Sequence, residues 1–147
     1  MKDAVGGSLL LNLVVIFTSI VILFFVGIIA YSKAYKVKNK IIEVIERYEN
    51  FDANVISELQ TDLLNTGYRT ATPEQIMAKC GEESLSYNAD QAKSAGFLYC
   101  VYNKNNSMSG YSYEVVTYVQ FQFPIIGDLI SLPVRGETKV LGKNYTY

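Results

Sequence analysis

The chain has 147 residues, of which 50% are apolar and 18% are charged, and its net charge is −1. This length predicts one domain, and the apolar share is too high for a disordered chain. The near-neutral charge argues against nucleic-acid binding, which needs a positive surface. The sequence has no histidine and only two cysteines, so the commonest general base and metal ligand are missing. We therefore expect no catalytic site, metal site, cofactor or small-molecule substrate, and a protein that is not an enzyme.

After a lead segment over residues 1–8, an uncharged apolar run extends from Leu9 to Ala30. At about 1.5 Å per residue, a helix of this length covers about 33 Å, which is enough for the hydrocarbon core of a bilayer. A cleaved secretory signal is the alternative, but its apolar region is shorter and ends at a small-x-small site. We predict an uncleaved transmembrane helix over residues 9–31, and hence membrane lipid as a partner.

Helical periodicity continues beyond the predicted span and indicates an amphipathic stem helix over residues 32–66. The simplest arrangement is one long stem, although Asp52 could cap a second helical piece, and Gly67 is suited to end it. We expect the apolar face of the stem to pack on a sheet formed later in the chain. The residues of that face are Val44, Tyr48, Phe51, Val55, Leu59 and Leu63, and their expected partners are Val115, Val119, Phe121 and Phe123.

The region over residues 67–147 is predicted to hold a short helix and a small antiparallel sheet. Thr72 and Pro73 are typical of a helix start, and this helix ends at Cys80 before a mostly irregular segment over 81–96. Period-two patterns predict strands over 97–102, 111–123 and 134–141, separated by a loop over 103–110 and a turn or short helix over 125–131. The middle strand has an apolar face of odd-numbered residues and a wet face opposite. The fold class is therefore α+β, with a long N-terminal helix packed on a small antiparallel sheet.

Two features of the chain disagree about the side of the membrane on which this region lies. Cys80 and Cys100 are an isolated pair outside any CxxC motif, and an even count in a small domain suggests an extracytoplasmic disulfide. Two buried free thiols are the alternative. Four lysines between the span and the first acidic residue favour the cytoplasm under the positive-inside rule, and they also suit contact with lipid headgroups. These are Lys33, Lys36, Lys38 and Lys40. We give the cysteines precedence and expect the C-terminal domain outside.

A membrane helix that continues as an amphipathic stem and precedes a small disulfide-bearing sheet resembles type IV pilin-like subunits. The segment Phe121–Gly127, followed by Leu132–Thr138, further resembles the TadE-like minor pilins of tight-adherence pili, in which a strand often ends in a proline-containing turn before a last strand. The resemblance implies a pilin-like fold and a bacterial protein that packs against other pilin-like subunits or a pilus or secretion platform.

Pilin-like precursors are cut after a glycine and carry a glutamate at the fifth residue of the product. Gly6, Gly7 and Ser8 precede the apolar run and match such a processing site, with a flexible lead-in as the alternative. Cleavage after Gly7 would place Asn12 at the fifth position, where the family has a glutamate. Asn12 can make a polar contact inside the membrane but cannot neutralise a neighbouring amino terminus. A polar residue tolerated near the lipid surface is the other interpretation of Asn12.

These observations predict a single-pass protein of the bacterial cytoplasmic membrane, with its C-terminal domain outside the cytoplasm or in a surface filament. Its expected function is that of a structural subunit, a minor pilin or pseudopilin, that acts by helix packing. The alternative is an uncleaved accessory protein of a secretion or conjugation apparatus whose domain binds a partner. A membrane-anchored enzyme is a third and less favoured hypothesis, because the carboxylates and serines of the sequence form no catalytic motif.

Overall fold

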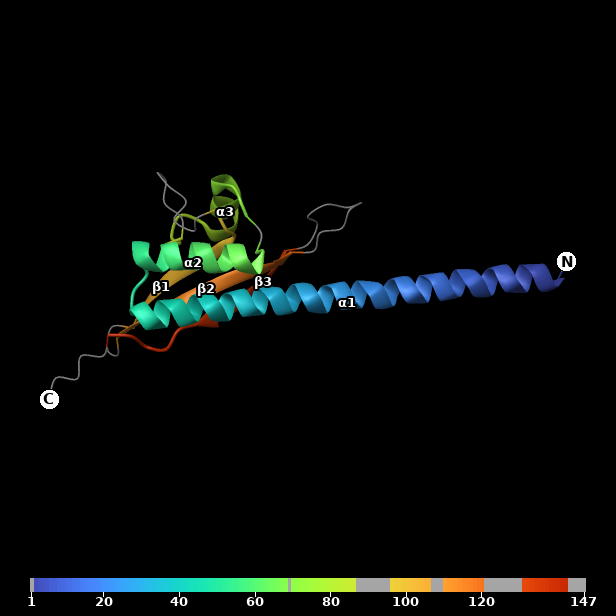
Figure 1. The fold of residues 1–147 in the computed structure, drawn as a ribbon, viewed down its shortest axis with the longest axis horizontal. Coiled ribbons are helices and arrows are strands. Elements are labelled where there is room, and N and C mark those ends of the chain that lie inside the picture. The colour runs from blue at the N-terminus through green and yellow to red at the C-terminus, as the bar shows by residue number, and fades with distance from the viewer. Residues whose placement is uncertain (1, 69, 87–95, 107–109, 121–130, 143–147) are drawn as a thin grey trace.

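A computed structural model describes residues 2–68, 70–86, 96–106, 110–120 and 131–142 (Figure 1). The helices are α1 (Lys2–Tyr48), α2 (Ala53–Thr66) and α3 (Pro73–Cys80), and the strands are β1 (Tyr99–Asn106), β2 (Gly110–Gln120) and β3 (Ser131–Glu137). The three strands form one antiparallel sheet in the order β1-β2-β3. This is the α+β class that the sequence predicts, with a long apolar N-terminal helix and a small antiparallel sheet.

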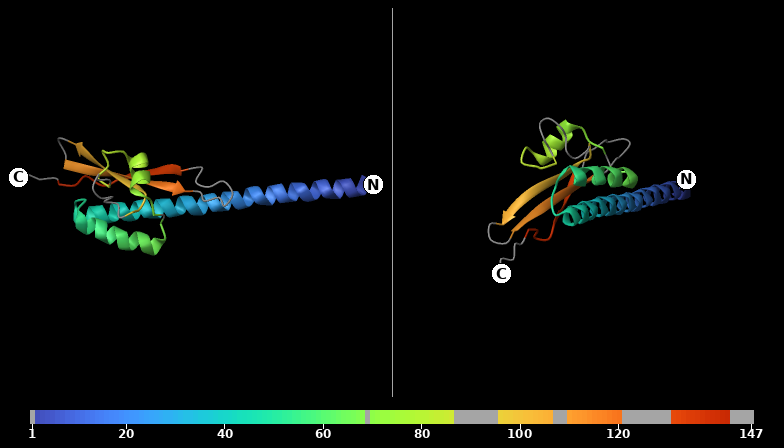
Figure 2. Two further views of the ribbon diagram at one scale, coloured as in Figure 1. Left: turned by 90° about the horizontal axis from the view of Figure 1, so that it is seen from above. Right: turned by 60° about the vertical axis from the view of Figure 1, so that its left-hand side comes forward.

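The first helix is a single element of 47 residues, and at about 1.5 Å per residue it is about 70 Å long. Its N-terminal half extends away from the rest of the chain, and its C-terminal half lies along the sheet (Figures 1 and 2). The predicted lead over residues 1–8 is not separate from the helix, because α1 begins at Lys2. Two glycines lower helix stability by about 1 kcal/mol each, which is too little to end a helix that is propagated by the long run after them.

The prediction of one stem helix over residues 32–66 is wrong. α1 ends at Tyr48, and Glu49 takes a positive φ of 53° that turns the chain. The Asp52 carboxylate then accepts hydrogen bonds from the amides of Asn54 and Val55 at 3.0 and 3.1 Å, so it caps α2 as the sequence suggested. Gly67, with φ of 62°, ends α2. α2 therefore folds back along α1, which lets both helices cover the same face of the sheet (Figure 2).

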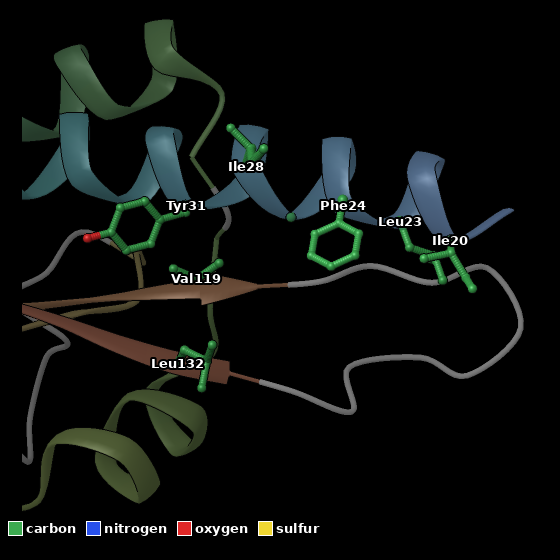
Figure 3. Close-up of a pocket in the computed structure, with 8 residues that line it drawn as sticks. Ile20, Leu23, Phe24, Ile28, Tyr31, Val119 and Leu132 are labelled. Atoms are coloured by element: carbon green, nitrogen blue, oxygen red, sulfur yellow. The ribbon is translucent and has the colours of Figure 1, made fainter. Parts of the chain in front are cut away.

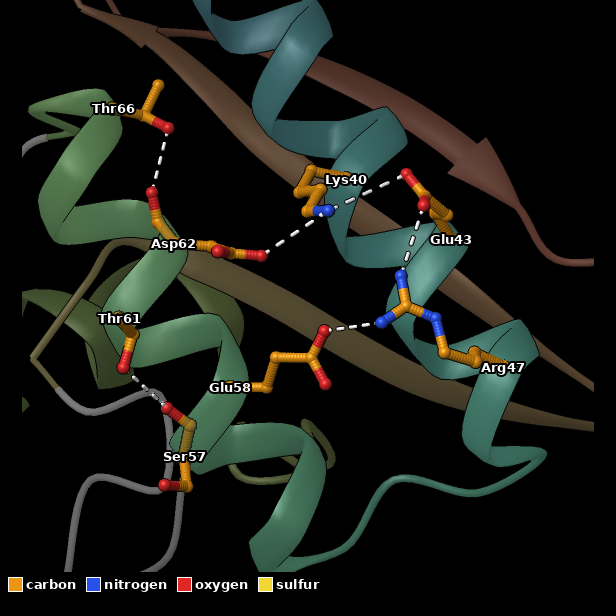
Figure 4. A network of polar contacts seen from close by, with 8 residues as sticks. All are labelled: Lys40, Glu43, Arg47, Ser57, Glu58, Thr61, Asp62 and Thr66. Carbon is orange, nitrogen blue, oxygen red and sulfur yellow. Dashed lines mark hydrogen bonds and ion pairs between the residues drawn. The ribbon is translucent and has the colours of Figure 1, made fainter.

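Ion pairs join α2 to the last turns of α1 (Figure 4). Lys40 Nζ lies 3.4 Å from a carboxylate oxygen of Asp62, and the Arg47 guanidinium lies 2.6 Å from Glu58 and 3.1 Å from Glu43. The charge of Glu58 raises the pKa of Arg47. Exposed pairs of this kind stabilise a fold only slightly. They fix the relative position of the two helices, whereas burial of the apolar faces holds the helices on the sheet.

The sheet is longer at the hairpin than the sequence predicts. β1 continues to Asn106, which pairs with Gly110, so residues 103–106 and 110 belong to strands rather than to a loop. β3 begins at Ser131 and includes Pro133, which lies opposite Tyr118. The backbone amides of successive residues in a strand point to opposite sides. The Thr138 amide donates to Tyr113 O, so the even-numbered amides of β3 point toward β2 and the odd-numbered positions point away from it. Pro133 is tolerated there because the sheet needs no donor at that position.

The main core lies between the sheet and the two long helices. Fully buried residues of α1 and α2 meet buried residues of β1 and β2 in one cluster, so the predicted packing of stem on sheet is confirmed for most of its members. The confirmed members are Val44, Val55, Leu59, Leu63 and Val115. Val119 packs in a smaller cluster with Ala34 and Val134. Tyr48 is the exception at 43% exposed, since it borders a polar groove beside Asn54 and Glu58. Phe121 and Phe123 lie outside the described residues.

The opposite face of the sheet is not wet along its length, which corrects the prediction. α3 packs there, and Ile76 meets Val116 and Tyr118 in a second buried cluster. The Thr72 hydroxyl and the Gln75 side chain form a capping box at the start of α3, as the sequence predicts for Thr72. The middle strand carries apolar side chains on both faces in this stretch, so it is covered by a helical layer on each side.

The segment after α3 covers part of the free edge of β1. The Leu85 amide donates to Val101 O at 2.7 Å, and the Ser86 hydroxyl donates to Tyr99 O at 2.8 Å. Ser84 is also buried, and its hydroxyl lies 2.7 Å from that of Ser86. The predicted irregular segment over 81–96 therefore has a structural role at its start, while residues 87–95 of it lie outside the described residues.

Candidate membrane and assembly surface

The N-terminal half of α1 forms an apolar surface that its own chain does not cover. In the part of the chain that the structure describes, α1 is the one helix long and apolar enough to cross a membrane, and none of its most apolar 18-residue window is buried. The polar side chains at its middle are satisfied within the helix. Thr18 Oγ1 donates to Val14 O at 2.7 Å, and Ser19 Oγ donates to Val15 O at 2.8 Å. These bonds remove most of the penalty of placing hydroxyls in hydrocarbon.

The residues proposed for processing and for a polar contact lie on this surface. Gly6, Gly7 and Ser8 are helical, and Ser8 and Asn12 are exposed on one side of α1, one turn apart. Among the described residues, Asn12 makes no side-chain hydrogen bond, unlike Thr18 and Ser19. The structure therefore does not bring the processing segment to any other group, and it leaves the Asn12 amide free to meet a partner outside the chain.

Aromatic and basic side chains gather where the apolar run ends. The rings of Tyr31 and Tyr35 are stacked with centroids 6.4 Å apart, and Lys38 Nζ lies 4.2 Å from the centroid of Tyr35. Tyr31 and Tyr35 are both about half exposed. Tyrosines are enriched at membrane–water boundaries, and lysines there extend their ammonium groups toward the headgroups. The column of Tyr31, Tyr35 and Lys38 is thus suited to lie at such a boundary.

The predicted cluster of four lysines is divided by the fold. Lys33 and Lys36 are exposed, but Lys40 pairs with Glu43 and Asp62. Lys38 is 8% exposed, and its alkyl chain lies against Gly136, where an added Cβ would be 2.8 Å from Lys38 Cδ. Gly136 thereby allows β3 to approach α1 closely. Contact with lipid headgroups is consequently open to Lys33 and Lys36, whereas most of Lys38 serves the packing of helix on sheet.

An apolar groove of about 560 Å³ separates α1 from the ends of β2 and β3 (Figure 3). Val119 and Leu132 form one wall, and the helix forms the other with Ile20, Leu23, Phe24, Gly27, Ile28 and Tyr31. Sequence patterns could not find this groove, because its two walls are far apart in the chain and meet through the packing of β2 and β3 on α1, which includes Val119 and Val134 against Ala34. That packing includes a hydrogen bond of 3.0 Å from Thr117 Oγ1 to Ala34 O.

The two cysteines meet between α3 and β1. Their sulfurs lie at bonding distance, and their Cα atoms are 5.4 Å apart, which is within the range of disulfides. Both residues are buried, and Tyr102 donates a hydrogen bond of 2.8 Å to Cys80 O. This geometry fits the predicted disulfide, and it attaches the second helical layer to the sheet.

Two buried tyrosines escaped sequence reasoning. The Tyr68 hydroxyl donates to Leu98 O at 2.9 Å and accepts from the Tyr118 amide at 3.2 Å, and burial raises the pKa of Tyr68 to about 12. Tyr99 is fully buried, its hydroxyl has no partner among the described residues, and burial raises its pKa well above the ordinary value. Both side chains are part of the core, so they bear on stability rather than on a reaction.

Among the described residues, no group of three or more histidine, cysteine, aspartate or glutamate side chains could hold a metal ion. The features that the structure does bring together are an uncovered apolar helix, an aromatic and basic column at its end, and an apolar groove beside it. Comparisons of the chain with protein-family models, with curated proteins and with solved structures find no match.

Proposed function

We propose that this chain is a pilin-like structural subunit, a minor pilin or pseudopilin, that is anchored by α1 in the bacterial cytoplasmic membrane. It acts by packing its membrane helix against equivalent helices in a surface filament, or against the platform that assembles one. The observation that supports this proposal is the division of α1 into a half that its own domain buries and a half that it leaves uncovered.

The division is sharp. Val37, Ile41, Val44 and Ile45 are at most 1% exposed, whereas the large apolar side chains from Leu9 to Ile29 are all exposed by a third or more. Burying one such side chain is worth about 1.5–3 kcal/mol, so more than a dozen of them would make α1 insoluble in water. Lipid, together with the helices of other subunits, can cover this surface. A subunit that assembles through its helix needs such a surface.

Asn12 supplies a specific contact for that assembly. In hydrocarbon an amide gains from a partner on a neighbouring helix, and such bonds are worth about 0.6–2 kcal/mol. Substituting Asn12→Leu should reduce crosslinking between full-length copies in membranes. Thr18→Val is the matched control, because the Thr18 hydroxyl already bonds to its own helix. If the unaltered span forms no crosslink to itself or to a partner, the subunit proposal gives way to a plain anchor.

An uncleaved accessory protein of a secretion or conjugation apparatus is the second candidate. It is favoured by the helical conformation of residues 6–8, because proteolytic cleavage occurs most readily in exposed irregular segments. Mass spectrometry of the mature amino terminus separates the two functions. A product that begins at Gly7 or Ser8 supports the processed subunit, and an intact Met1 supports the accessory protein or a pilin homologue that escapes cleavage.

The proposal includes an extracytoplasmic position for the C-terminal domain. The disulfide supports it, since disulfides persist in oxidising compartments. Both cysteines are in that bond, so Ser57→Cys on the exposed surface of α2 introduces a single free thiol. A membrane-impermeant maleimide should label it in intact cells, while Ser8→Cys, on the other side of the membrane, should stay protected until lysis. The reverse pattern would place the domain in the cytoplasm.

A further inference from the structure

We propose that the apolar groove between α1 and the ends of β2 and β3 holds an acyl chain of a membrane phospholipid, with the phosphate of that lipid at the Tyr31 end. This inference rests on the proposed membrane anchoring. It adds a lipid-binding site that belongs to a single subunit.

The depth of the groove supports this occupant. With Leu9 to Ala30 taken as the span, the helical wall from Ile20 to Ile28 belongs to its C-terminal half, below the boundary marked by Tyr31. Val119 packs against Ala30 and Ala34, so the ends of β2 and β3 lie at this boundary, where Leu132 is 52% exposed. Water in an apolar groove at this depth would find no polar partners. An acyl chain is the apolar molecule that surrounds the groove on its open side.

The size and shape of the groove favour a flexible chain over a second helix. Its volume of about 560 Å³ lies within the range of about 300–1,000 Å³ for sites of small ligands. A neighbouring helix would have to approach the axis of α1 to about 8–10 Å along this face. Val119 and Leu132 stand over the same face (Figure 3), so the rim of the sheet blocks that approach. An acyl chain can bend around the rim.

The charge at the upper end of the groove complements a phosphate. Between Tyr31 and Glu43 the helix carries four lysines and no acidic residue. Tyr31 lines the groove, Tyr35 stacks above it, and Lys38 Nζ lies over the ring of Tyr35. Lys33 and Lys36 are exposed at the same level but lie on the side of α1 that faces α2. A chain in the groove would thus place its headgroup near the Tyr31 hydroxyl, on the same side of α1 as the Lys38 ammonium over Tyr35.

Photocrosslinking in vesicles tests the proposal with the full-length protein. The vesicles contain phosphatidylethanolamine and phosphatidylglycerol, with a diazirine on the upper half of the phosphatidylglycerol acyl chain, and adducts are mapped by mass spectrometry. We expect adducts on the β3 peptide that contains Leu132, in addition to those along α1. Gly27→Leu places a side chain in the groove and should reduce the β3 adducts about tenfold, which corresponds to about 1.4 kcal/mol. Gly7→Leu, outside the groove, should leave them unchanged.

A second pair of variants guards against a folding defect in the first. Leu132→Gln makes one wall polar and should lower the amount of phospholipid that copurifies with the protein in mild detergent, whereas Val140→Gln, which is also exposed but far from the groove, should not. Near-ultraviolet circular dichroism verifies that each variant keeps the packing of the parent.

The outcomes separate this inference from the proposed anchoring. Adducts along α1 without adducts on β3, or β3 adducts that Gly27→Leu does not reduce in a folded protein, overturn the lipid site and leave the anchor intact. Crosslinks from the groove to a second copy of α1 overturn it in favour of helix packing. A complete lack of adducts on residues 9–30 refutes the membrane anchoring itself.

Discussion

Removing the hydroxyl of Tyr99 should stabilise the protein, which is the opposite of what most core substitutions do. The side chain is 0% exposed, and its hydroxyl has no hydrogen-bond partner among the described residues. A buried polar group without a partner costs about 1–3 kcal/mol. Tyr99→Phe removes that penalty and leaves a small void where the oxygen was, which takes back part of the gain. We expect a net stabilisation of about 1 kcal/mol.

Tyr68→Phe is the matched control, because it deletes the same atom from the same core with the opposite expectation. The Tyr68 hydroxyl donates to Leu98 O at 2.9 Å and accepts from the Tyr118 amide at 3.2 Å. Its loss leaves a buried carbonyl and a buried amide without this partner, at a cost of about 1–3 kcal/mol. The two variants should therefore differ in stability by about 2–4 kcal/mol, although each lacks one oxygen atom.

The assay is thermal unfolding of the full-length protein in mild detergent, followed by near-ultraviolet circular dichroism. For a folded region of about 100 residues, 1 kcal/mol changes Tm by about 4–8 °C. Tyr99→Phe should raise Tm by about 4 °C and Tyr68→Phe should lower it by more than that. If Tyr99→Phe melts below the parent, the hydroxyl has a partner, and our account of this core is wrong.

The remaining predictions concern the core, the disulfide and pH. Leu59→Asp should destabilise the domain by about 3 kcal/mol or more, since it buries a charge. Leu64→Asp, on the exposed side of α2, should change stability by less than about 0.5 kcal/mol. Equal melting temperatures of the two variants would refute the helix-on-sheet core. Replacing Cys80 and Cys100 by alanine opens a loop of 20 residues and should lower the unfolding free energy by about 3 kcal/mol in the chain-entropy model. A denaturant titration that finds the same unfolding free energy as in the parent would contradict this prediction. Because the pKa of Tyr68 is raised to about 12 from 10.0, the stability it contributes is fully present below pH 10 and should be lost by about pH 12, at most about 2.7 kcal/mol. Alkaline unfolding followed by phenolate absorbance should show this loss in the parent and a smaller one in Tyr68→Phe.

Local signals in the sequence identified both ends of α2 and the start of α3, although not the ends of α1. Asp52, Thr72 and Gly67 act through hydrogen bonds or dihedral angles within a few residues of themselves, so their roles are readable without a fold. The apolar run was equally readable, because an uncharged run of this length is typical of a helix long enough to cross a bilayer, and α1 is such a helix. The alternation in β2 also identified the strand, although the pattern did not fix where its hairpin begins.

Features that depend on distant segments were not predictable. The return of α2 along α1 depends on Glu49 adopting a positive φ, and nothing in its neighbours requires that. The packing of α3 on the second face of the sheet could be predicted only by knowing that Val116 and Tyr118 point toward α3. The apolar groove exists only because the ends of β2 and β3 come to rest beside Gly27. The absence of a partner for the Tyr99 hydroxyl is likewise a property of the assembled core.

The unbroken helix from Lys2 to Tyr48 joins the apolar N-terminal half of α1 to the folded domain without a turn. Val37, Ile41, Val44 and Ile45 are buried in the core, and no turn or glycine pair separates them from the apolar half. Any rotation or tilt of the apolar half of α1 is therefore transmitted directly to the domain. Each residue of an α-helix advances the phase by about 100°. One alanine inserted between Ala30 and Ala34 would turn the domain by that angle relative to the apolar half of α1, so the length of the helix sets the angle between the two halves.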